Sequence, residues 1–494
     1  MDRETAIKEI RDAITKRGFN QDTIIDYIAQ ELGFGYLDAP ELLEQAGNLP
    51  SDAKTQELYN AEALHIASLE TVFIAAQERD AREIETVISL ETIPGAAAIA
   101  LNRTSNAANL LAALEIGHTR AVILTLDATR DARARAKIRE ALQRLNVPVV
   151  CAKFEPGCAS PHEAHEKDPA KFTAAIKEAY FKSARPDNTI DYIDSFIIDD
   201  IAKFKSTRIK TGFDNLDELA GGLYPGLYVL AAISSLGKTS FALQLADQIA
   251  ERGSEVVFFS LEQSRLELVT KSLARITSEL HPEKPLTSLA IRRGAIVNPE
   301  AQEARDEYAK RICNRVTIVE GNFNCTSSYI GRYLKQYIER TGARPVVFVD
   351  YLQILQPEPD AKKYGSTKET VDNTVTELKR LSRDLDLTIF LISSVNRTNY
   401  LTPIDFESLK ETGGIEYTAD VVFGLQLQCL NDKLFEKEKN TVERREKIKE
   451  EKARNPRRIE LVCLKNRYGI SRYSCYYNYY PANDLFSERD ELEY

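Results

Sequence analysis

Residues 232–240, with the sequence Ala-Ile-Ser-Ser-Leu-Gly-Lys-Thr-Ser, constrain the fold of this chain more than any other segment. They follow an apolar run at 227–231 and precede a helical pattern at 241–250. A strand, a loop and a helix in this order turn the backbone N–H groups of the loop, and the positive end of the helix, toward a bound phosphate. The segment therefore predicts a phosphate-binding loop between a β-strand and an α-helix.

The side chains of this loop have expected parts in binding ATP. Lys238 is expected to reach the β- and γ-phosphates, and the Thr239 hydroxyl is expected to hold Mg²⁺. Ala232 stands where the usual motif begins with glycine, so the bare pattern match is imperfect. The remaining residues that we expect to contact the nucleotide are Ser234, Ser235, Gly237 and Ser240.

Composition limits the class of protein. A chain of 494 residues is long enough for two or three domains. A net charge of −10 argues against a protein coated with a basic surface, but it allows a small basic patch or channel. The seven cysteines form no Cys-x-x-Cys pair, so neither a disulfide framework nor a structural zinc site is expected. Without an apolar signal core or a membrane-spanning run, the expected location is the cytoplasm, with no membrane partner.

The N-terminal half is expected to hold a short helical segment (1–58) and a small α/β domain (59–184). Helices are predicted at 5–17, 21–32 and 39–46. In the second part, β-rich runs alternate with helical patterns, which is typical of a mostly parallel sheet. These runs are 71–75, 97–101, 121–126 and 147–151. A linker (185–208) follows, and its apolar stripe over 190–204 predicts one helix. That helix packs either on its own domain or on a neighbouring subunit.

The C-terminal half again has a βαβ pattern, and we expect one α/β domain at 209–484. Strands are predicted at 227–232, 255–260, 316–319, 345–349, 388–393, 421–427 and 458–464. The mixed-charge run 434–458 is read as a solvated helix or a partly disordered excursion. Residues 485–494 are read as a frayed acidic tail.

Polar side chains follow several of these strands, at the sheet edge where open α/β sheets bind ligands. Glu262 follows one strand and can orient a water for attack on the γ-phosphate. Asp350 follows another and suits the Mg²⁺ site. Asn396 and Arg397 follow a third, in a cluster that can sense the γ-phosphate. Late in the chain come Lys465 and Arg467, a pair that can reach a nucleotide on an adjacent subunit.

Taken together, residues 209–483 resemble the C-terminal motor domain of DnaB-type replicative helicases, a RecA-like ATPase. In that family alanine is common at the position of Ala232. One departure is Ser394, which stands where the family usually has glutamine and puts γ-phosphate sensing there in doubt. The segments that carry the resemblance are 211–217, 222–226, 231–240, 259–262, 349–353, 393–397, 409–420 and 465–469.

The resemblance implies a homo-hexameric ring with ATP and Mg²⁺ at the subunit interfaces and single-stranded DNA in a central pore. Lys238, Thr239, Glu262 and Asp350 would act in cis, and Arg467 with Lys465 in trans. The linker helix would dock on the next subunit, and a helicase loader or a primase would be further partners. Short basic loops in a pore can bind backbone phosphates without making the whole protein basic. The expected DNA contacts are Lys362, Lys363, Lys368, Arg397 and Lys410.

Residues 59–180 resemble a TOPRIM domain, as found in phage primase-helicases and topoisomerases. TOPRIM chemistry needs a glutamate after one strand and an Asp-x-Asp after another, to hold Mg²⁺. Here Ala76 and Gln77 occupy the Glu-Gly positions, and Thr129 replaces the second aspartate, so that Asp127 alone remains. Asp131 lies too far along to substitute simply. We therefore expect a degenerate domain that acts as a collar and does not polymerise RNA.

The predicted fold is thus a RecA-like P-loop ATPase domain preceded by a small TOPRIM-like α/β domain and a linker helix. The predicted function is an ATP-dependent hexameric helicase of phage or mobile-element DNA replication, moving 5′→3′ on single-stranded DNA. Two alternatives stay open. One is a bifunctional primase-helicase, and the other is a RecA-like ATPase that acts on protein partners without unwinding DNA.

Overall fold

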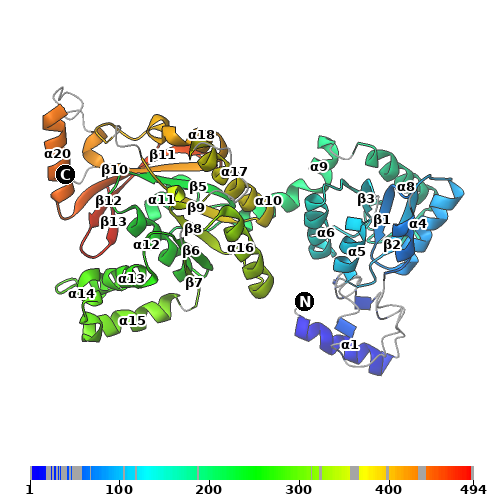
Figure 1. Ribbon diagram of the computed structural model, residues 1–494. Helices are drawn as coiled ribbons and strands as arrows, with labels where there is room; N and C mark the ends of the chain where they lie inside the picture. Colours follow the sequence, from blue (N-terminus) through cyan, green and yellow to red (C-terminus); the bar gives the residue numbers. More distant parts are fainter. Residues whose placement is uncertain are drawn as a thin grey trace. The chain divides into compact units, whose positions relative to one another are not determined.

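The computed structural model divides the chain into two compact units, residues 1–203 and 204–494 (Figure 1). Their boundary falls inside the segment 185–208 that the sequence indicates as a linker. From residue 58 to 490 the structure describes all residues except 67, 104–105, 117–118, 129, 186–187, 313, 322–324, 357–366, 396–399 and 432–440. Before residue 58 it describes 3–17, 24, 27, 28, 32, 34, 42, 43 and 46.

A four-stranded parallel sheet of order β2-β1-β3-β4 forms the centre of the N-terminal unit. Its strands are β1 (Thr71–Ala75), β2 (Ala96–Ala100), β3 (Ala121–Leu124) and β4 (Val149–Cys151). The helices are α1 (Arg3–Arg17), η3 (Ala61–His65), α4 (Glu78–Leu90), α5 (Ala107–Ile116), α6 (Ala132–Arg144), α7 (Pro161–Lys167), α8 (Pro169–Ser183), α9 (Thr189–Ser195) and α10 (Ile197–Ser206). Val72 and Ile74 pack with α5 and α6, whereas Phe73 packs on the opposite face with α4 and α8. Both faces are therefore covered, as parallel sheets require.

The prediction of a small α/β domain with a parallel sheet is confirmed, and each expected β-rich run overlaps one strand. The helix predicted at 5–17 is α1. Most of the helices predicted at 21–32 and 39–46 lies outside the described residues.

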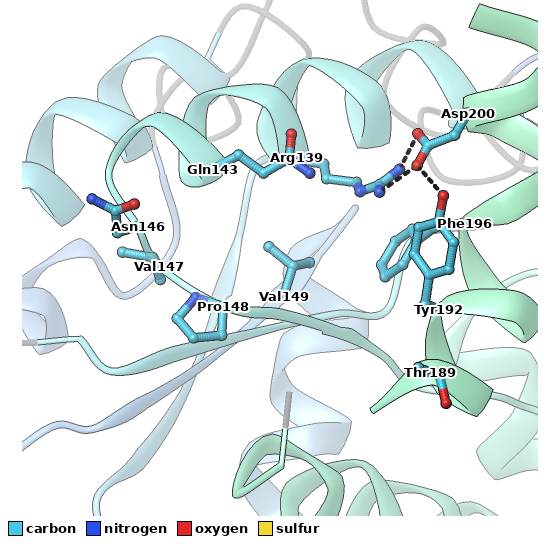
Figure 2. Close-up of a pocket in the computed structure, with 10 residues that line it drawn as sticks. All are labelled: Arg139, Gln143, Asn146, Val147, Pro148, Val149, Thr189, Tyr192, Phe196 and Asp200. Carbon is cyan, nitrogen blue, oxygen red and sulfur yellow. Dashed lines mark hydrogen bonds and ion pairs between the residues drawn. The ribbon is translucent and has the colours of Figure 1, made fainter. Parts of the chain in front are cut away.

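The linker is not the single helix that the sequence predicts. It consists of α9 and α10, which are separated at Phe196. Phe196 is buried, and the guanidinium of Arg139 lies 4.1 Å from the centre of its ring. Arg139 also forms two hydrogen bonds with Asp200, at 2.7 and 2.8 Å, and the Tyr192 hydroxyl donates to the same carboxylate at 2.9 Å (Figure 2). Docking of Phe196 against α6 thus explains the break.

These linker contacts form one wall of a cavity of about 660 Å³ (Figure 2). Within the single chain, Phe196 packs on its own domain, and docking of the linker on a neighbouring subunit stays a prediction. Other members of the predicted apolar stripe, Ile190, Ile193 and Ile201, are exposed in the single chain.

A nine-stranded sheet of order β13-β12-β11-β10-β5-β9-β8-β6-β7 forms the C-terminal unit. The strands from β10 to β7 in this order run parallel, and β11 to β13 continue the sheet as an antiparallel meander. The strands are β5 (Gly226–Ala232), β6 (Val256–Ser260), β7 (Val316–Glu320), β8 (Val346–Asp350), β9 (Thr388–Ser394), β10 (Val421–Leu427), β11 (Arg457–Asn466), β12 (Ser474–Tyr480) and β13 (Leu485–Arg489).

Helices lie on both faces of the central part of this sheet (Figure 1). The α-helices are α11 (Asp214–Ala220), α12 (Lys238–Glu251), α13 (Arg265–Leu280), α14 (Ser288–Arg292), α15 (Pro299–Ile312), α16 (Ser327–Thr341), α17 (Thr367–Leu385), α18 (Gly413–Thr418) and α20 (Thr441–Ala453). The short 3₁₀ helices are η5 (Ala295–Val297), η6 (Leu352–Ile354), η9 (Phe406–Thr412) and η10 (Gln428–Asn431). Among the described helices, none is both long and apolar enough to cross a bilayer.

The strands predicted between residues 227 and 464 are confirmed as β5 to β11, and part of the mixed-charge run is helix α20. The acidic tail expected at 485–494 is wrong for residues 485–489, which form β13. Strand β12 was not predicted either. Both strands exist because alternate side chains point inward: Cys475, Tyr477 and Tyr479 from β12 and Phe486 from β13 are buried in the core.

Candidate functional site

The phosphate-binding loop has the predicted form, with β5 ending at Ala232 and α12 beginning at Lys238. Gly237 caps the helix with a φ of +85°, in the left-handed region that glycine tolerates best. A Cβ atom added here would lie 2.7 Å from the Tyr479 ring, so any side chain would clash. The loop is therefore a close cradle in which the first N–H groups of α12 are available to an anion.

The strands beside β5 bring the other expected side chains to the same edge of the sheet. Asp350 ends β8 and is level with Ser260 at the end of β6. Ser394 ends β9 and is level with Ala232 at the end of β5. Because all these strands run parallel, their carboxyl ends meet in one place, as the sequence predicts.

Thr239 and Asp350 are in direct contact. The Thr239 hydroxyl donates to one carboxylate oxygen of Asp350 at 2.7 Å. The other oxygen, Oδ1, is buried and has no hydrogen-bond partner among the residues that the structure describes. Burial raises the pKa of Asp350 to about 6, against the opposing effects of the Thr239 hydrogen bond and the Lys238 charge. A buried carboxylate with a free oxygen beside a hydroxyl fits a Mg²⁺ ion, which prefers oxygen ligands.

No group of three or more His, Cys, Asp or Glu side chains in the described part of the chain could hold a metal by itself. This fits Mg²⁺ in a nucleotide site, because the ion is held there by one or two protein side chains together with the phosphates.

Lys238 lies over this site. Its Nζ atom donates to the Ser394 hydroxyl at 2.5 Å and lies 4.7 Å from the centre of the Tyr351 ring. The serine that replaces the usual glutamine therefore contacts the P-loop lysine directly. Neither Tyr351 nor Gln353, which donates to Ser393 at 3.0 Å, was predicted as a site residue. Their position in the segment that follows β8 is the signal that could have identified them.

Glu262 lies just beyond the end of β6, and its side chain is exposed. After burial itself, the Glu262 charge is the largest contribution that raises the pKa of Tyr351. It also contributes to the raised pKa of Asp350. The carboxylate is therefore near the proposed metal site and open to solvent, as a residue that orients water must be.

The outer side of the loop is held by residues from the C-terminal strands and α20. Arg457 donates to the carbonyl oxygen of Ser235 at 2.8 Å, and Lys452 donates to that of Ser234 at 3.5 Å. The side chains of Ser234 and Ser235 are exposed, whereas the Ser240 hydroxyl is buried and donates to Asp484 at 2.6 Å. The Ser240 side chain is thus engaged away from the nucleotide, although its backbone belongs to the loop.

Lys465 and Arg467 lie at the opposite edge of the sheet. Val421, at the start of β10, pairs with Tyr228 near the start of β5 on one side and with Asn466 at the end of β11 on the other. The end of β11 therefore lies beside the amino ends of the parallel strands. The Arg467 guanidinium is 3.2 Å from Asp420, and Lys465 donates to the Glu416 carbonyl at 2.6 Å. Three to five residues of β5 lie between the level of this pair and the P-loop of the same chain, which is roughly 10 to 17 Å along the strand at about 3.3 Å per residue.

Several expected site residues, or their side chains, lie outside the part of the chain that the structure describes. Asn396 and Arg397 lie outside the described residues, as do Lys362 and Lys363. Lys368 is the second residue of α17, and Lys410 lies in η9. The structure describes the backbone of both residues but not their side chains.

Comparison with known families decides the assignment. The sequence model of the family described as "DnaB-like helicase C terminal domain" matches residues 208–475, which are more than half of the chain. The chain belongs to the DnaB-like helicase family. This confirms the predicted resemblance to the DnaB C-terminal domain and the RecA-like α/β fold class. The resemblance to TOPRIM and the phage or mobile-element origin stay predictions.

Individual relatives agree with the family. The replicative DNA helicase DnaB of Leifsonia xyli subsp. xyli is 29% identical over 234 residues, which are 46% of this chain and 48% of that protein. The DnaB protein of Buchnera aphidicola subsp. Baizongia pistaciae is 25% identical over 310 residues, 59% of this chain and 62% of its own. The chain spans about half the length of the curated relatives it matches.

Among solved structures, the "ATPase Domain of G40P" aligns at 22% identity with a TM-score of 0.49. The alignment covers 60% of this chain and 99% of that one.

In the N-terminal unit, the positions expected from TOPRIM follow β1 and β3. Ala76 is buried directly after β1, and Gln77 caps α4. Asp127 follows β3, and Asp131 caps α6, where its carboxylate accepts a hydrogen bond from the Asp127 N–H at 3.3 Å. Thr129 lies outside the described residues. A buried alanine supplies no ligand where the glutamate would stand, which supports the expectation of a degenerate site.

Proposed function

We propose that this chain is an ATP-dependent DNA helicase that assembles as a hexamer and moves 5′→3′ along single-stranded DNA. Its role would be in the replication of a phage or mobile element, without primase activity. One observation carries the proposal: Thr239 contacts Asp350 close to Lys238, in a chain of the DnaB-like family. The free buried oxygen of Asp350 is the ligand that a Mg²⁺–nucleotide complex needs at this position.

In this proposal each side chain at the carboxyl edge of the sheet has one task. Lys238 holds the β- and γ-phosphates, and Thr239 and Asp350 hold Mg²⁺. Bound Mg²⁺ would offset the negative charge on the phosphate oxygens during transfer. Glu262 is exposed near the same site, where it would orient the attacking water. Ser394, at the end of β9, would connect the γ-phosphate to that strand, because it accepts a hydrogen bond from the Lys238 ammonium that holds the phosphate.

Arg467 and Lys465 would complete the site of the neighbouring subunit. Their distance from the P-loop of their own chain supports this assignment, because several residues of β5 lie between them. The proposed DNA contacts remain Lys362, Lys363, Lys368, Arg397 and Lys410, in two segments that would face the pore; Lys368 lies in the first turn of α17 and Lys410 in η9. A loader or a primase would be a further partner.

The proposal is tested by strand separation. The wild-type chain is expected to displace a labelled strand from a forked DNA in the presence of ATP and Mg²⁺, and single-stranded DNA should stimulate its ATP hydrolysis. The matched control is Glu262→Gln, which keeps the loop and metal ligands and should lose about 100- to 10,000-fold in hydrolysis. Displacement is measured by gel and ATP turnover by phosphate release. Forks with a 5′ or a 3′ tail report the direction of movement.

Two results would contradict the helicase assignment. One is ATP hydrolysis that DNA does not stimulate, without strand displacement on either fork. That result would favour an ATPase that acts on protein partners. The other is displacement that the Glu262→Gln variant performs as well as the wild type.

Primer synthesis is expected to be absent. With a single-stranded template, labelled ribonucleotides and either Mg²⁺ or Mn²⁺, the chain should yield no labelled oligonucleotide, because Ala76 replaces a metal-binding carboxylate. Products analysed on a denaturing gel, beside a known primase as positive control, give the answer. A ladder of short RNA would show a bifunctional primase-helicase instead.

A further inference from the structure

The hairpin β12–β13 packs its turn against the first turn of α12. The turn residue Asp484 is buried, and its Oδ1 atom accepts a hydrogen bond from the Ser240 hydroxyl at 2.6 Å. Ser240 directly follows Thr239, whose own hydroxyl is bonded to Asp350. Two consecutive side chains of α12 are thus held by two carboxylates, one on the metal side and one on the hairpin side.

A largely but not fully buried lysine joins this pair. The Lys271 ammonium, from α13, lies 2.9 Å from Asp484 Oδ1 and donates to the Ser240 hydroxyl at 3.1 Å. Only 17% of the Lys271 side chain and 4% of the Asp484 side chain are exposed. Lys271 is also close enough to Asp350 to oppose the rise that burial causes in the pKa of that carboxyl. Lys271 is thus bonded to the hairpin carboxylate, and its charge also reaches the proposed metal site.

The hairpin contacts the P-loop at further points. The Tyr479 ring closes over Gly237, and its hydroxyl donates to the Ser240 hydroxyl at 3.4 Å. On the next turn of α12, the Gln244 side chain donates to the carbonyl oxygen of Phe486 and accepts from its N–H, both at 2.8 Å. The hairpin thus contacts Gly237 at the end of the loop and Ser240 and Gln244 in the first two turns of α12.

We propose that Asp484 is a positioning residue for the nucleotide site: by holding Ser240 and Lys271 it fixes the first turn of α12, so that Thr239 and Asp350 are aligned for Mg²⁺. This inference rests on the proposed ATPase function. Removal of the Asp484 charge would free Lys271 from its hairpin partner, while the charge of Asp350 would still act on it. A cation drawn toward Asp350 competes directly with a metal ion there.

The test is the Mg²⁺ dependence of nucleotide binding by the full chain. Asp484→Asn removes the charge, keeps the size and tolerates the φ of +52° at this position, since asparagine adopts left-handed backbone readily. The probe is ADP that carries an N-methylanthraniloyl fluorophore, titrated at several Mg²⁺ concentrations. The Mg²⁺ concentration for half-maximal binding should rise about tenfold, the size of one lost charge-assisted hydrogen bond. Affinity measured in EDTA should stay within about twofold, because desolvation and stacking of the nucleotide are unchanged.

Glu488→Gln is the matched control on the same hairpin. Glu488 accepts hydrogen bonds from the N–H groups of Asp214 and Asn215, both at 2.8 Å, and so anchors β13 to α11. The Glu488→Gln variant should show the same Mg²⁺ dependence of nucleotide binding as the wild type. Should Asp484→Asn fail to fold, Ser240→Ala provides a second variant. It removes the hydroxyl, keeps the Asp484–Lys271 pair, and is expected to raise the Mg²⁺ requirement about threefold.

The possible results separate this inference from the proposed function. A wild-type Mg²⁺ requirement in both Asp484→Asn and Ser240→Ala overturns the positioning role, and so does an equal shift in Glu488→Gln. A wild-type chain that binds Mg²⁺–nucleotide but does not separate strands overturns the helicase proposal alone. A wild-type chain that binds no nucleotide at all overturns both.

Discussion

Replacement of Lys238 by alanine is expected to lower the rate of ATP hydrolysis by about 100- to 1,000-fold, the usual cost of removing a group that stabilises charge in the transition state. The Lys238 ammonium is the cation that lies between the loop and the end of β9, where it contacts Ser394. In the proposed site it would lie where the phosphate oxygens gain negative charge. Steady-state hydrolysis in the presence of single-stranded DNA measures the effect.

Lys452→Ala is the control for this change, because Lys452 contacts the same loop from its outer side through the Ser234 carbonyl. Loss of that contact should reduce turnover by no more than about fivefold, which is about 1 kcal/mol. If both variants lost activity equally, the effect would come from disturbance of the loop, and a direct role of the Lys238 charge would be refuted.

Replacement of Arg467 by alanine is expected to reduce hydrolysis by about 10³- to 10⁵-fold while leaving nucleotide affinity nearly unchanged. The two quantities separate because Arg467 lies at the opposite edge of the sheet from the P-loop of its own chain. Fluorescent ADP binding and phosphate release measure them independently. Lys379→Met is the matched control, since Lys379 contacts the same Asp420 carboxylate, at 2.5 Å.

A mixing experiment decides whether Arg467 acts on a neighbour. Lys238→Ala and Arg467→Ala chains, each nearly inactive alone, are combined in one assembly. Some interfaces then pair an intact lysine with an intact arginine, so hydrolysis should reappear in proportion to those interfaces. No recovery at any ratio, with mixed assembly verified, would show that both residues serve the same site within one chain.

Sequence patterns were sufficient for the parallel part of the large sheet. Strands such as β6 and β8 are buried on both faces and read as unbroken apolar runs, which are distinctive between polar loops. Strand β12 was missed because it alternates tyrosine and cysteine with polar residues, and tyrosine is common on exposed surfaces too. Strand β13 was missed because its charged residues at the chain end look like a solvated tail, although Phe486 and Glu488 anchor it to α12 and α11.

The candidate site shows the same limit. Lys238, Thr239, Glu262 and Asp350 follow strands directly, so strand order and direction are sufficient to bring them together. Asp484 meets Ser240 across 244 positions of the chain. That contact depends on how an antiparallel hairpin folds back over α12, and local patterns carry no information about it. The break in the linker at Phe196 was likewise invisible, because it results from packing against Arg139 of another helix.

Asp420 gives the motor unit a further property. Its carboxylate accepts the N–H of Leu227 at 2.8 Å, at the beginning of β5, and also holds the Arg467 guanidinium. The other end of β5 opens into the P-loop. In the proposed ring, the fully buried strand β5 would thus connect the nucleotide site of its own subunit with the site of the neighbouring subunit that Arg467 completes. Because close-packed interiors transmit strain, the seven residues of β5 would couple ATP hydrolysis at one subunit interface to hydrolysis at the next.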